Sequence, residues 1–205
     1  MKMYRVGFID NSFDLLPDYQ KRLQRHEIEL FFPENGKSKE EIIKWIIENN
    51  IRCLLIDHKL LPDYEYVGTD LLAYVNGVLP DLPCMILTAY TSDSLEENLV
   101  TENMIISRDC LDASSLASFC EKLKQAADVF SKRLDLHEIE YRDLLKAKQE
   151  GIITSQQEER LEYLYKLLKS YGEIDEIPAE MLKPEVENKV NSLIDKLNLL
   201  ISKEP

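Results

Sequence analysis

Basic residues are scarce in this 205-residue chain, where 25 lysines and arginines stand against 38 aspartates and glutamates for a net charge of -13 at pH 7. A nucleic-acid backbone needs a basic protein face, so this composition argues against a nucleic-acid partner. Long apolar runs are also missing, and none approaches the roughly 18 residues that a membrane span requires. The first residues, MKMYRVGFIDNSFD, include acids and do not read as a targeting signal. We therefore expect a soluble protein that does not enter a membrane.

Cysteine is rare, and its four copies are not clustered. They lack the paired spacing of a metal site, and at least two lie in apolar runs, where thiols act as small hydrophobic groups. This argues against a zinc site and predicts reduced thiols in a cytoplasmic protein. The residues are Cys53, Cys84, Cys110 and Cys120.

Apolar runs of strand length alternate with helix-like segments in the first half of the chain. Such alternation predicts crossover units on a parallel sheet, and hence a five-stranded, doubly wound α/β domain of flavodoxin type over residues 1–130. Ser38, followed by Glu41, is the predicted cap of one helix. The predicted strands are 4–10, 28–32, 51–57, 83–90 and 103–107, and the predicted helices are 13–26, 38–50, 68–79 and 94–100, with a long helix following.

The second half has no strand-like run after Ser107 and predicts a helical extension over residues 131–205. Apolar residues recur at coiled-coil spacing, which favours one helix from about 113 to 150, a turn at Gly151 and a returning helix capped by Thr154 or Ser155. A third helix is expected after a loop. Packing among the three helices and association with a second chain both remain open. The three apolar seams are Leu116, Cys120, Leu123, Ala127, Phe130, Leu134, His137, Tyr141 and Leu144; Leu161, Leu164, Leu168 and Tyr171; and Val186, Val190, Leu193, Leu197 and Leu200.

Polar residues whose side chains could bind a ligand or take part in a reaction follow four of the predicted strands. Asp10 and Asn11 follow the first strand, Asp57 the third, Thr88 the fourth and Arg108 the fifth. In a flavodoxin-like order the carboxyl ends of these strands converge at one edge, where ligands of open α/β sheets bind. We expect the five side chains to share one pocket.

The segments FIDN, LLIDHKLLP with the following Gly68, MILTAY and IISRD resemble, in order, the signature of a response-regulator receiver domain. The resemblance covers residues 4–130. It implies that Asp57 is the phosphoacceptor, that Asp10, Asn11 and Asp57 hold Mg²⁺, and that Thr88 and Arg108 contact the phosphate. Phosphoryl transfer depends mainly on positioning and charge neutralisation, which such a set supplies.

Three positions depart from that signature. Asn11 stands where the family usually has a second acid, and a neutral amide is a weaker Mg²⁺ ligand, so a weakened metal site is expected. Arg108 replaces the usual lysine with a wide planar cation. Ile105 occupies the place of the aromatic switch residue. Signalling by the family's usual pair of threonine and aromatic residue is therefore not expected.

These features favour a cytoplasmic signalling adaptor without DNA-binding or catalytic output. Its receiver-like domain, phosphorylated on Asp57 or not, would be joined to a helical module, residues 131–205, that binds a protein partner or a second copy. The resemblance also implies a bacterial or archaeal setting and an upstream histidine kinase. One alternative is a degenerate pseudo-receiver that acts as a constitutive scaffold. The other is a metal-dependent phosphoryl-transfer or hydrolase enzyme, which is disfavoured because Ser12 stands where haloacid-dehalogenase-type phosphatases have a second acid. A nicotinamide-dependent enzyme is disfavoured because VGFIDNS lacks the GxGxxG turn.

Overall fold

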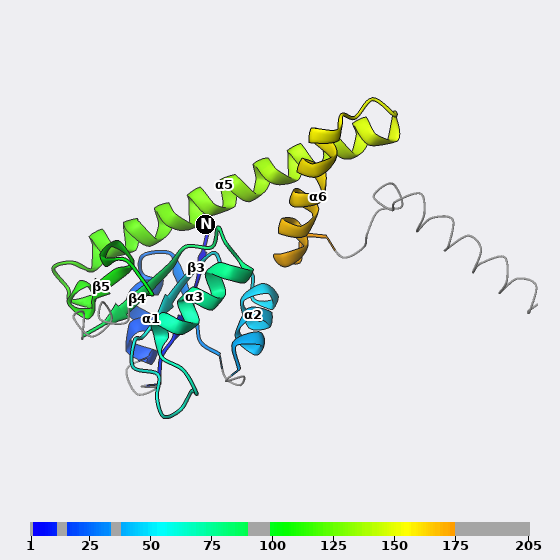
Figure 1. Cartoon of the computed structure of the whole chain (residues 1–205). Helices are drawn as coiled ribbons and strands as arrows, with labels where there is room; N and C mark the ends of the chain where they lie inside the picture. Colours follow the sequence, from blue (N-terminus) through cyan, green and yellow to red (C-terminus); the bar gives the residue numbers. More distant parts are fainter. Residues whose placement is uncertain (1, 12–15, 34–37, 90–98, 175–205) are drawn as a thin grey trace, which may run out of the picture. The chain divides into compact units, whose positions relative to one another are not determined.

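The computed structural model describes residues 2–11, 16–33, 38–89 and 99–174 (Figure 1). The chain divides into two compact units, Met1–Asp135 and Leu136–Pro205, which are described separately below. Their boundary falls inside one long helix, α5 (Leu116–Gln149), five residues beyond the boundary drawn from the sequence.

The first unit is built on a five-stranded sheet in which every pairing is parallel. The strand order is β2-β1-β3-β4-β5, which is the flavodoxin-like order. The predicted doubly wound α/β fold is therefore confirmed. The strands are β1 (Tyr4–Ile9), β2 (Ile28–Phe31), β3 (Cys53–Ile56), β4 (Cys84–Thr88) and β5 (Ile105–Ser107).

Helices connect the strands at most of the predicted places. At the start of α2 the Ser38 hydroxyl accepts a hydrogen bond from the Glu41 amide, and the Glu41 carboxylate accepts one from the Ser38 amide, so the predicted capping box is present. Of the helix expected at 94–100, residues 94–98 lie outside the described residues, and 99–100 form a bend instead. The helices of this unit before α5 are α1 (Leu16–Gln24), α2 (Lys39–Glu48), α3 (Gly68–Val78) and two 3-10 turns, η2 (Glu102–Met104) and η3 (Arg108–Leu111).

Alternate residues of each strand face opposite layers of helices. Val6 and Phe8 of β1 belong to a buried cluster that includes Leu23 of α1 and both Phe119 and Leu123 of α5, so α1 and α5 cover that face of the sheet. Helices α2 and α3 lie on the other face (Figure 1), as right-handed crossovers require. With both faces covered, the carboxyl edge of the sheet is left as the accessible place for a site.

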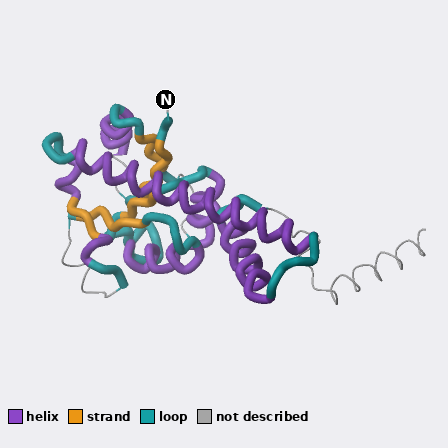
Figure 2. Tube along the Cα trace, turned by 90° about the horizontal axis from the view of Figure 1, so that it is seen from above, coloured by secondary structure: helices purple, strands orange, loops and turns teal. Residues whose placement is uncertain are grey.

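The second unit contains a helical hairpin. The part of α5 beyond residue 135 ends before Gly151, whose φ of +71° lies in the left-handed region that suits glycine. Helix α6 (Ser155–Ser170) follows, and its N-cap is Thr154, whose hydroxyl accepts a hydrogen bond from the Gln157 amide. Figure 2 shows α6 running back beside the end of α5.

Ion pairs join the two helices of the hairpin. The Arg160 guanidinium contacts both carboxylate oxygens of Glu140, at 2.9 and 2.6 Å, and the Lys148 ammonium lies 3.1 Å from Glu158. The predicted seam of α6 is mostly buried, since Leu161, Leu164 and Leu168 are at most 1% exposed. The predicted third helix, with Val186 to Leu200, lies outside the described residues.

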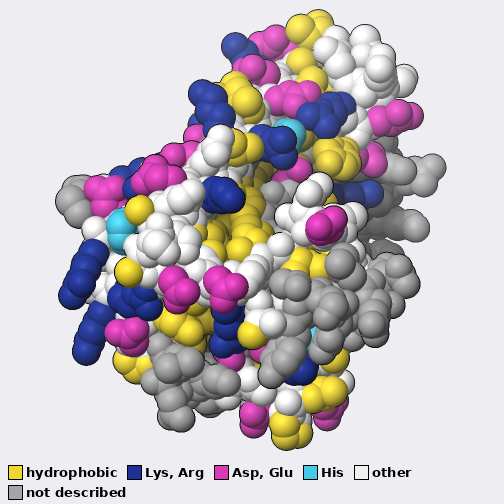
Figure 3. All heavy atoms as spheres, turned by 90° about the vertical axis from the view of Figure 1, so that its left-hand side faces the viewer, with side chains coloured by type: hydrophobic (Ala, Val, Ile, Leu, Met, Phe, Trp, Pro, Cys, Tyr) yellow, Lys and Arg dark blue, Asp and Glu magenta, His cyan; other side chains and the backbone are white. Residues whose placement is uncertain are grey.

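Basic and acidic side chains are mixed on the face of the molecule that Figure 3 shows. Figure 3 shows lysine and arginine side chains interspersed with aspartate and glutamate over one face. Among the described residues, no helix combines the length and apolar character that crossing a bilayer would demand. All four cysteines are free thiols, and burial raises the pKa of Cys53 to about 12.

Gly68, the first residue of α3, lies against the backbone that carries Asp57. A Cβ atom at Gly68 would lie 2.0 Å from the Asp57 carbonyl oxygen, so Gly68→Ala must displace the loop between β3 and α3. We expect Gly68→Ala to lower the free energy of unfolding by about 2 kcal/mol, the usual scale of overpacking. Urea unfolding followed by circular dichroism measures this change.

The matched control is Gly77→Ala in the same helix, where a Cβ atom would meet nothing within 4 Å. Because alanine is the better helix former, the control should gain about 0.5 to 1 kcal/mol. Equal effects of the two substitutions would show that the approach of Gly68 to Asp57 does not constrain the loop.

Candidate functional site

The candidate site lies where four parallel strands end at the same edge of the sheet. Asp10 follows β1 and Asp57 follows the neighbouring strand β3, while Thr88 ends β4 and Arg108 follows β5. Ile9 is in register with Ile56, and the Asp57 amide donates a hydrogen bond of 2.8 Å to the Ile9 carbonyl. The two aspartates are thus held side by side by the backbone.

Arg108 reaches both aspartates with one nitrogen of its guanidinium. This Nη2 lies 2.5 Å from Asp10 Oδ2 and 3.0 Å from Asp57 Oδ1. The side chains of Asp10 and Asp57 are only 1% and 9% exposed, and that of Arg108 is 20% exposed. This one nitrogen of the guanidinium therefore bridges two largely buried carboxylates that would otherwise repel each other.

The surroundings keep Arg108 charged. Burial lowers its pKa, but the charges of Asp10 and Asp57 and their hydrogen bonds raise it, and the net pKa is above its usual value. Phe8 lies beneath the guanidinium, whose carbon is 5.9 Å from the ring centroid. An arginine is well suited to this place because it stacks on aromatic rings and is less strongly hydrated than a lysine.

The backbone after β3 holds the other oxygen of Asp57. The Lys59 amide donates a hydrogen bond to Asp57 Oδ2 at 3.1 Å. Asn11 turns its amide toward the same loop and donates to the Leu61 carbonyl at 3.3 Å. Asn11 therefore connects the end of β1 to the loop that follows Asp57.

Thr88 and Ile105 lie on the two strands beyond β3. Thr88 is fully buried at the end of β4, in register with Ser107 of β5. Ile105 is half-buried at the start of β5. Arg108 opens the turn η3, which forms because the Ser107 hydroxyl accepts a hydrogen bond from the Asp109 amide.

Tyr64 is a residue near the site that the sequence analysis does not single out. It is 4% exposed, and burial, followed by the nearby charges of Asp10 and Asp63, raises its pKa to about 12. The pair of tyrosines in the segment DYEY is a signal in the sequence, because aromatic residues in a polar loop are often packed against a neighbouring site. Only the path of the loop brings Tyr64 toward Asp10.

The donor set does not fit Mg²⁺ in this arrangement. Mg²⁺ requires near-octahedral oxygen ligands at about 2.0 to 2.1 Å. Here the carboxylates of Asp10 and Asp57 are directed at the Arg108 guanidinium. The Asn11 side-chain nitrogen donates to the Leu61 carbonyl, so Asn11 could offer Mg²⁺ only a neutral amide oxygen, which is a weak ligand. Among the described residues, no group of three or more histidines, cysteines or acids is placed to hold a metal ion. The cation that balances these two acids is the protein's own arginine.

The structure is similar to the signal receiver domain of an HD domain-containing protein from Pseudomonas fluorescens Pf-5. The TM-score is 0.50 at 15% sequence identity, over 65% of this chain and 93% of that domain. The chain thus contains a receiver fold, with an additional helical region beyond the part that is matched.

Two further solved structures show similarity to the chain. A CheY-like response regulator receiver domain protein from Methanospirillum hungatei JF-1 has a TM-score of 0.46 at 22% identity, over 64% of this chain and 99% of that one. The response regulator TrrA from Thermotoga maritima, solved in complex with Mg²⁺ and beryllofluoride, has a TM-score of 0.46 at 18% identity, over 60% and 99%. No family model and no curated protein matches the sequence.

We expect Arg108→Ala to lower the free energy of unfolding at neutral pH by about 3 kcal/mol, because it removes the cation from two buried carboxylates. Chemical denaturation measures this loss. The control Arg142→Ala removes an exposed arginine that pairs with Glu138 on the same helix, and it should cost no more than about 0.5 kcal/mol.

The same variant tests the fit of a metal. Millimolar Mg²⁺ should raise the melting temperature of Arg108→Ala, whose carboxylates are open to an external cation, and should leave that of the native chain unchanged. A native chain that Mg²⁺ stabilises as strongly as the variant would contradict the assignment of Arg108 as the resident cation.

Proposed function

We propose that this protein is a signalling adaptor of response-regulator type, whose receiver-like domain is joined to a helical module that acts by protein contact. The receiver fold supports the signalling role, since the similar domain from Pseudomonas fluorescens is a signal receiver domain. We place the adaptor in the cytoplasm of a bacterium or archaeon, where a histidine kinase is its natural upstream partner.

The contact of Arg108 with Asp10 and Asp57 is the observation that supports one version of this proposal. Both acids are already balanced by a cation of the chain, and Asp57 is also held by the Lys59 amide. A site with its charges satisfied internally gains little from a metal. We therefore infer a constitutive, pseudo-receiver form of the domain, which presents its surfaces without first binding Mg²⁺.

Phosphorylation of Asp57 is the second candidate for the input. It is favoured by the position of Asp57 beside a fully charged arginine, because a guanidinium fork binds phosphate oxygens well. Thr88 would supply a hydroxyl from the neighbouring strand. In this version Arg108 would leave Asp10 for the phosphoryl group, so the contact with Asp10 would be the switch.

The helical module is the proposed output. Its described part carries large apolar side chains in solvent: Leu136 and Ile139 are 53% and 56% exposed and lie one turn apart on α5. Exposed apolar side chains grouped on a helix are typical of association surfaces. We propose that residues 131–205 bind a second copy of the chain or another protein.

Beryllofluoride with Mg²⁺, which mimics a phosphorylated aspartate, distinguishes the two forms of input. We expect it to leave the melting temperature of the native chain unchanged, because Arg108 occupies the carboxylates. A rise in the native chain that is lost in Asp57→Asn would instead establish Asp57 as a phosphoacceptor and would overturn the constitutive form.

Self-association through the helical module can be measured by sedimentation velocity over a range of concentrations. We expect the native chain to associate, and the double variant Leu136→Asp and Ile139→Asp to shift at least tenfold toward monomer, because it places charges on the apolar face. Leu99→Asp, which places the same charge on an exposed leucine of the receiver-like unit, is the control and should have no effect. A native chain that stays monomeric throughout would remove self-association from the output.

A further inference from the structure

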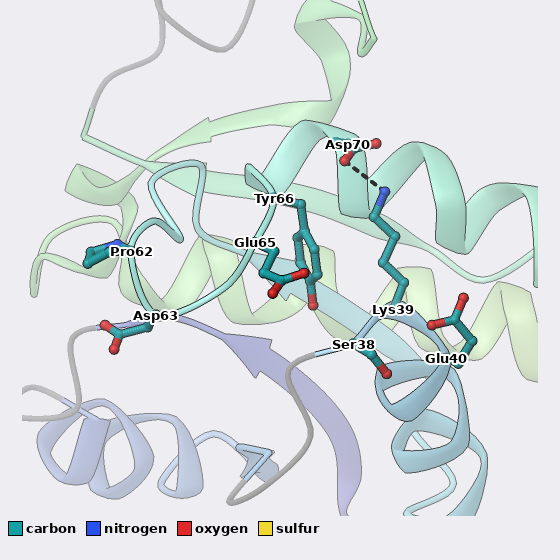
Figure 4. A pocket seen from close by; sticks show the side chains of 8 residues that line it. All are labelled: Ser38, Lys39, Glu40, Pro62, Asp63, Glu65, Tyr66 and Asp70. Atoms are coloured by element: carbon teal, nitrogen blue, oxygen red, sulfur yellow. Dashed lines mark hydrogen bonds and ion pairs between the residues drawn. The ribbon is translucent and has the colours of Figure 1, made fainter.

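A second pocket of the receiver-like unit lies apart from Arg108, between the start of α2 and the loop that leads from β3 into α3. Its volume is about 560 Å³, within the range of small-ligand sites. Figure 4 shows Ser38, Lys39 and Glu40 on one side and residues of the loop on the other. Nothing in the receiver-like site uses this pocket.

The pocket is strongly acidic. Four carboxylates line it, with a single lysine: Glu40, Asp63, Glu65, Asp70 and Lys39. The Lys39 ammonium is 2.7 Å from Asp70 and lies 5.4 Å from the ring centroid of Tyr66. The lining therefore already holds one cation between a carboxylate and an aromatic ring, and it retains an excess of negative charge.

The amide groups at the start of α2 do not make this an anion site. The Ser38 amide donates to the Glu41 carboxylate, and the Glu41 amide donates to the Ser38 hydroxyl, so the capping box uses donors that an anion would need. Acids on both sides of the pocket would repel an anion as well.

The Tyr66 hydroxyl is an independent sign of a ligand. Tyr66 is 8% exposed, and among the described residues its buried hydroxyl has no hydrogen-bond partner. Figure 4 shows this hydroxyl pointing into the space between Glu65 and Ser38. Burial, followed by the neighbouring Tyr64 and acids, raises the pKa of Tyr66, so the group stays a neutral hydroxyl with lone pairs to offer. Buried polar atoms in native proteins are nearly always satisfied, so a hydrogen-bond partner for this hydroxyl, which can both donate and accept, is expected from a bound molecule.

We propose that this pocket binds the guanidinium of an arginine side chain presented by a partner polypeptide. A guanidinium carries five donors in a planar fork and can therefore serve the Tyr66 hydroxyl and a carboxylate such as Glu65 at once. An ammonium matches this less well, and Lys39 already supplies one at Asp70. The proposal goes beyond the signalling role and does not depend on the chemistry of Asp57.

Nuclear magnetic resonance titration of the full chain with N-acetyl-arginine amide tests the proposal. We expect saturable shifts of backbone amides confined to residues 38–40 and 63–70. The neutral analogue N-acetyl-citrulline amide has nearly the same shape and should cause no saturable shift. Equal shifts with the citrulline compound would overturn the role of charge, and tighter binding of spermidine than of the arginine compound would overturn the choice of a guanidinium.

Three variants separate a built site from general acidity. Glu65→Gln should weaken binding of N-acetyl-arginine amide about tenfold, the scale of a charged hydrogen bond, and Tyr66→Phe should weaken it several-fold. Glu162→Gln makes the same charge change on α6 and should leave binding unchanged. Tyr66→Phe should melt no lower than the native chain, because the hydroxyl it removes has no described partner. Equal weakening by Glu65→Gln and Glu162→Gln would show that only the net charge of the chain matters, and it would overturn the proposed site. This result is independent of the beryllofluoride experiment, which tests the input at Asp57.

Discussion

The ionic contact of Arg108 with Asp10 and Asp57 is the constraint on which the receiver-like site depends. Parallel pairing of β1 and β3 places the two acids beside each other at the sheet edge, with their side chains almost fully buried. Two buried carboxylates placed beside each other repel, and a cation between them relieves this repulsion. Arginine, directly after β5, is long enough to reach both acids.

The loop after β3 connects this site to the acidic pocket. It starts at Asp57, passes Tyr64, whose pKa responds to Asp10, and reaches Tyr66 in the pocket, before Gly68 closes it against the Asp57 carbonyl. The rings of Tyr64 and Tyr66 are 5.6 Å apart. The loop thus joins the end of β3 to the surface where a partner is proposed to bind.

The sequence was sufficient to predict the sheet, because continuous apolar runs and intervening helical periods each follow a simple rule. It also located Asp10, Asp57 and Arg108 at strand ends. It could not predict that Arg108 contacts both acids, since that depends on side-chain length, burial and competition with a metal. The segment DYEY indicates two tyrosines packed in a polar loop, but the positions of Tyr64 and Tyr66 could not be predicted, because a loop has no period from which its path can be read. The turn η3 was missed because it results from a local hydrogen bond of Ser107.

The helical hairpin differs from the sheet in how far apart its partners lie along the chain. Arg160 and Glu140 are 20 residues apart, and the turn at Gly151 needs only neighbouring residues, whereas β1 must pair with β3 across the whole of α1, β2 and α2. Short loops close at a lower entropic cost than long ones. The hairpin should accordingly form early in folding, before the strands of the parallel sheet have paired.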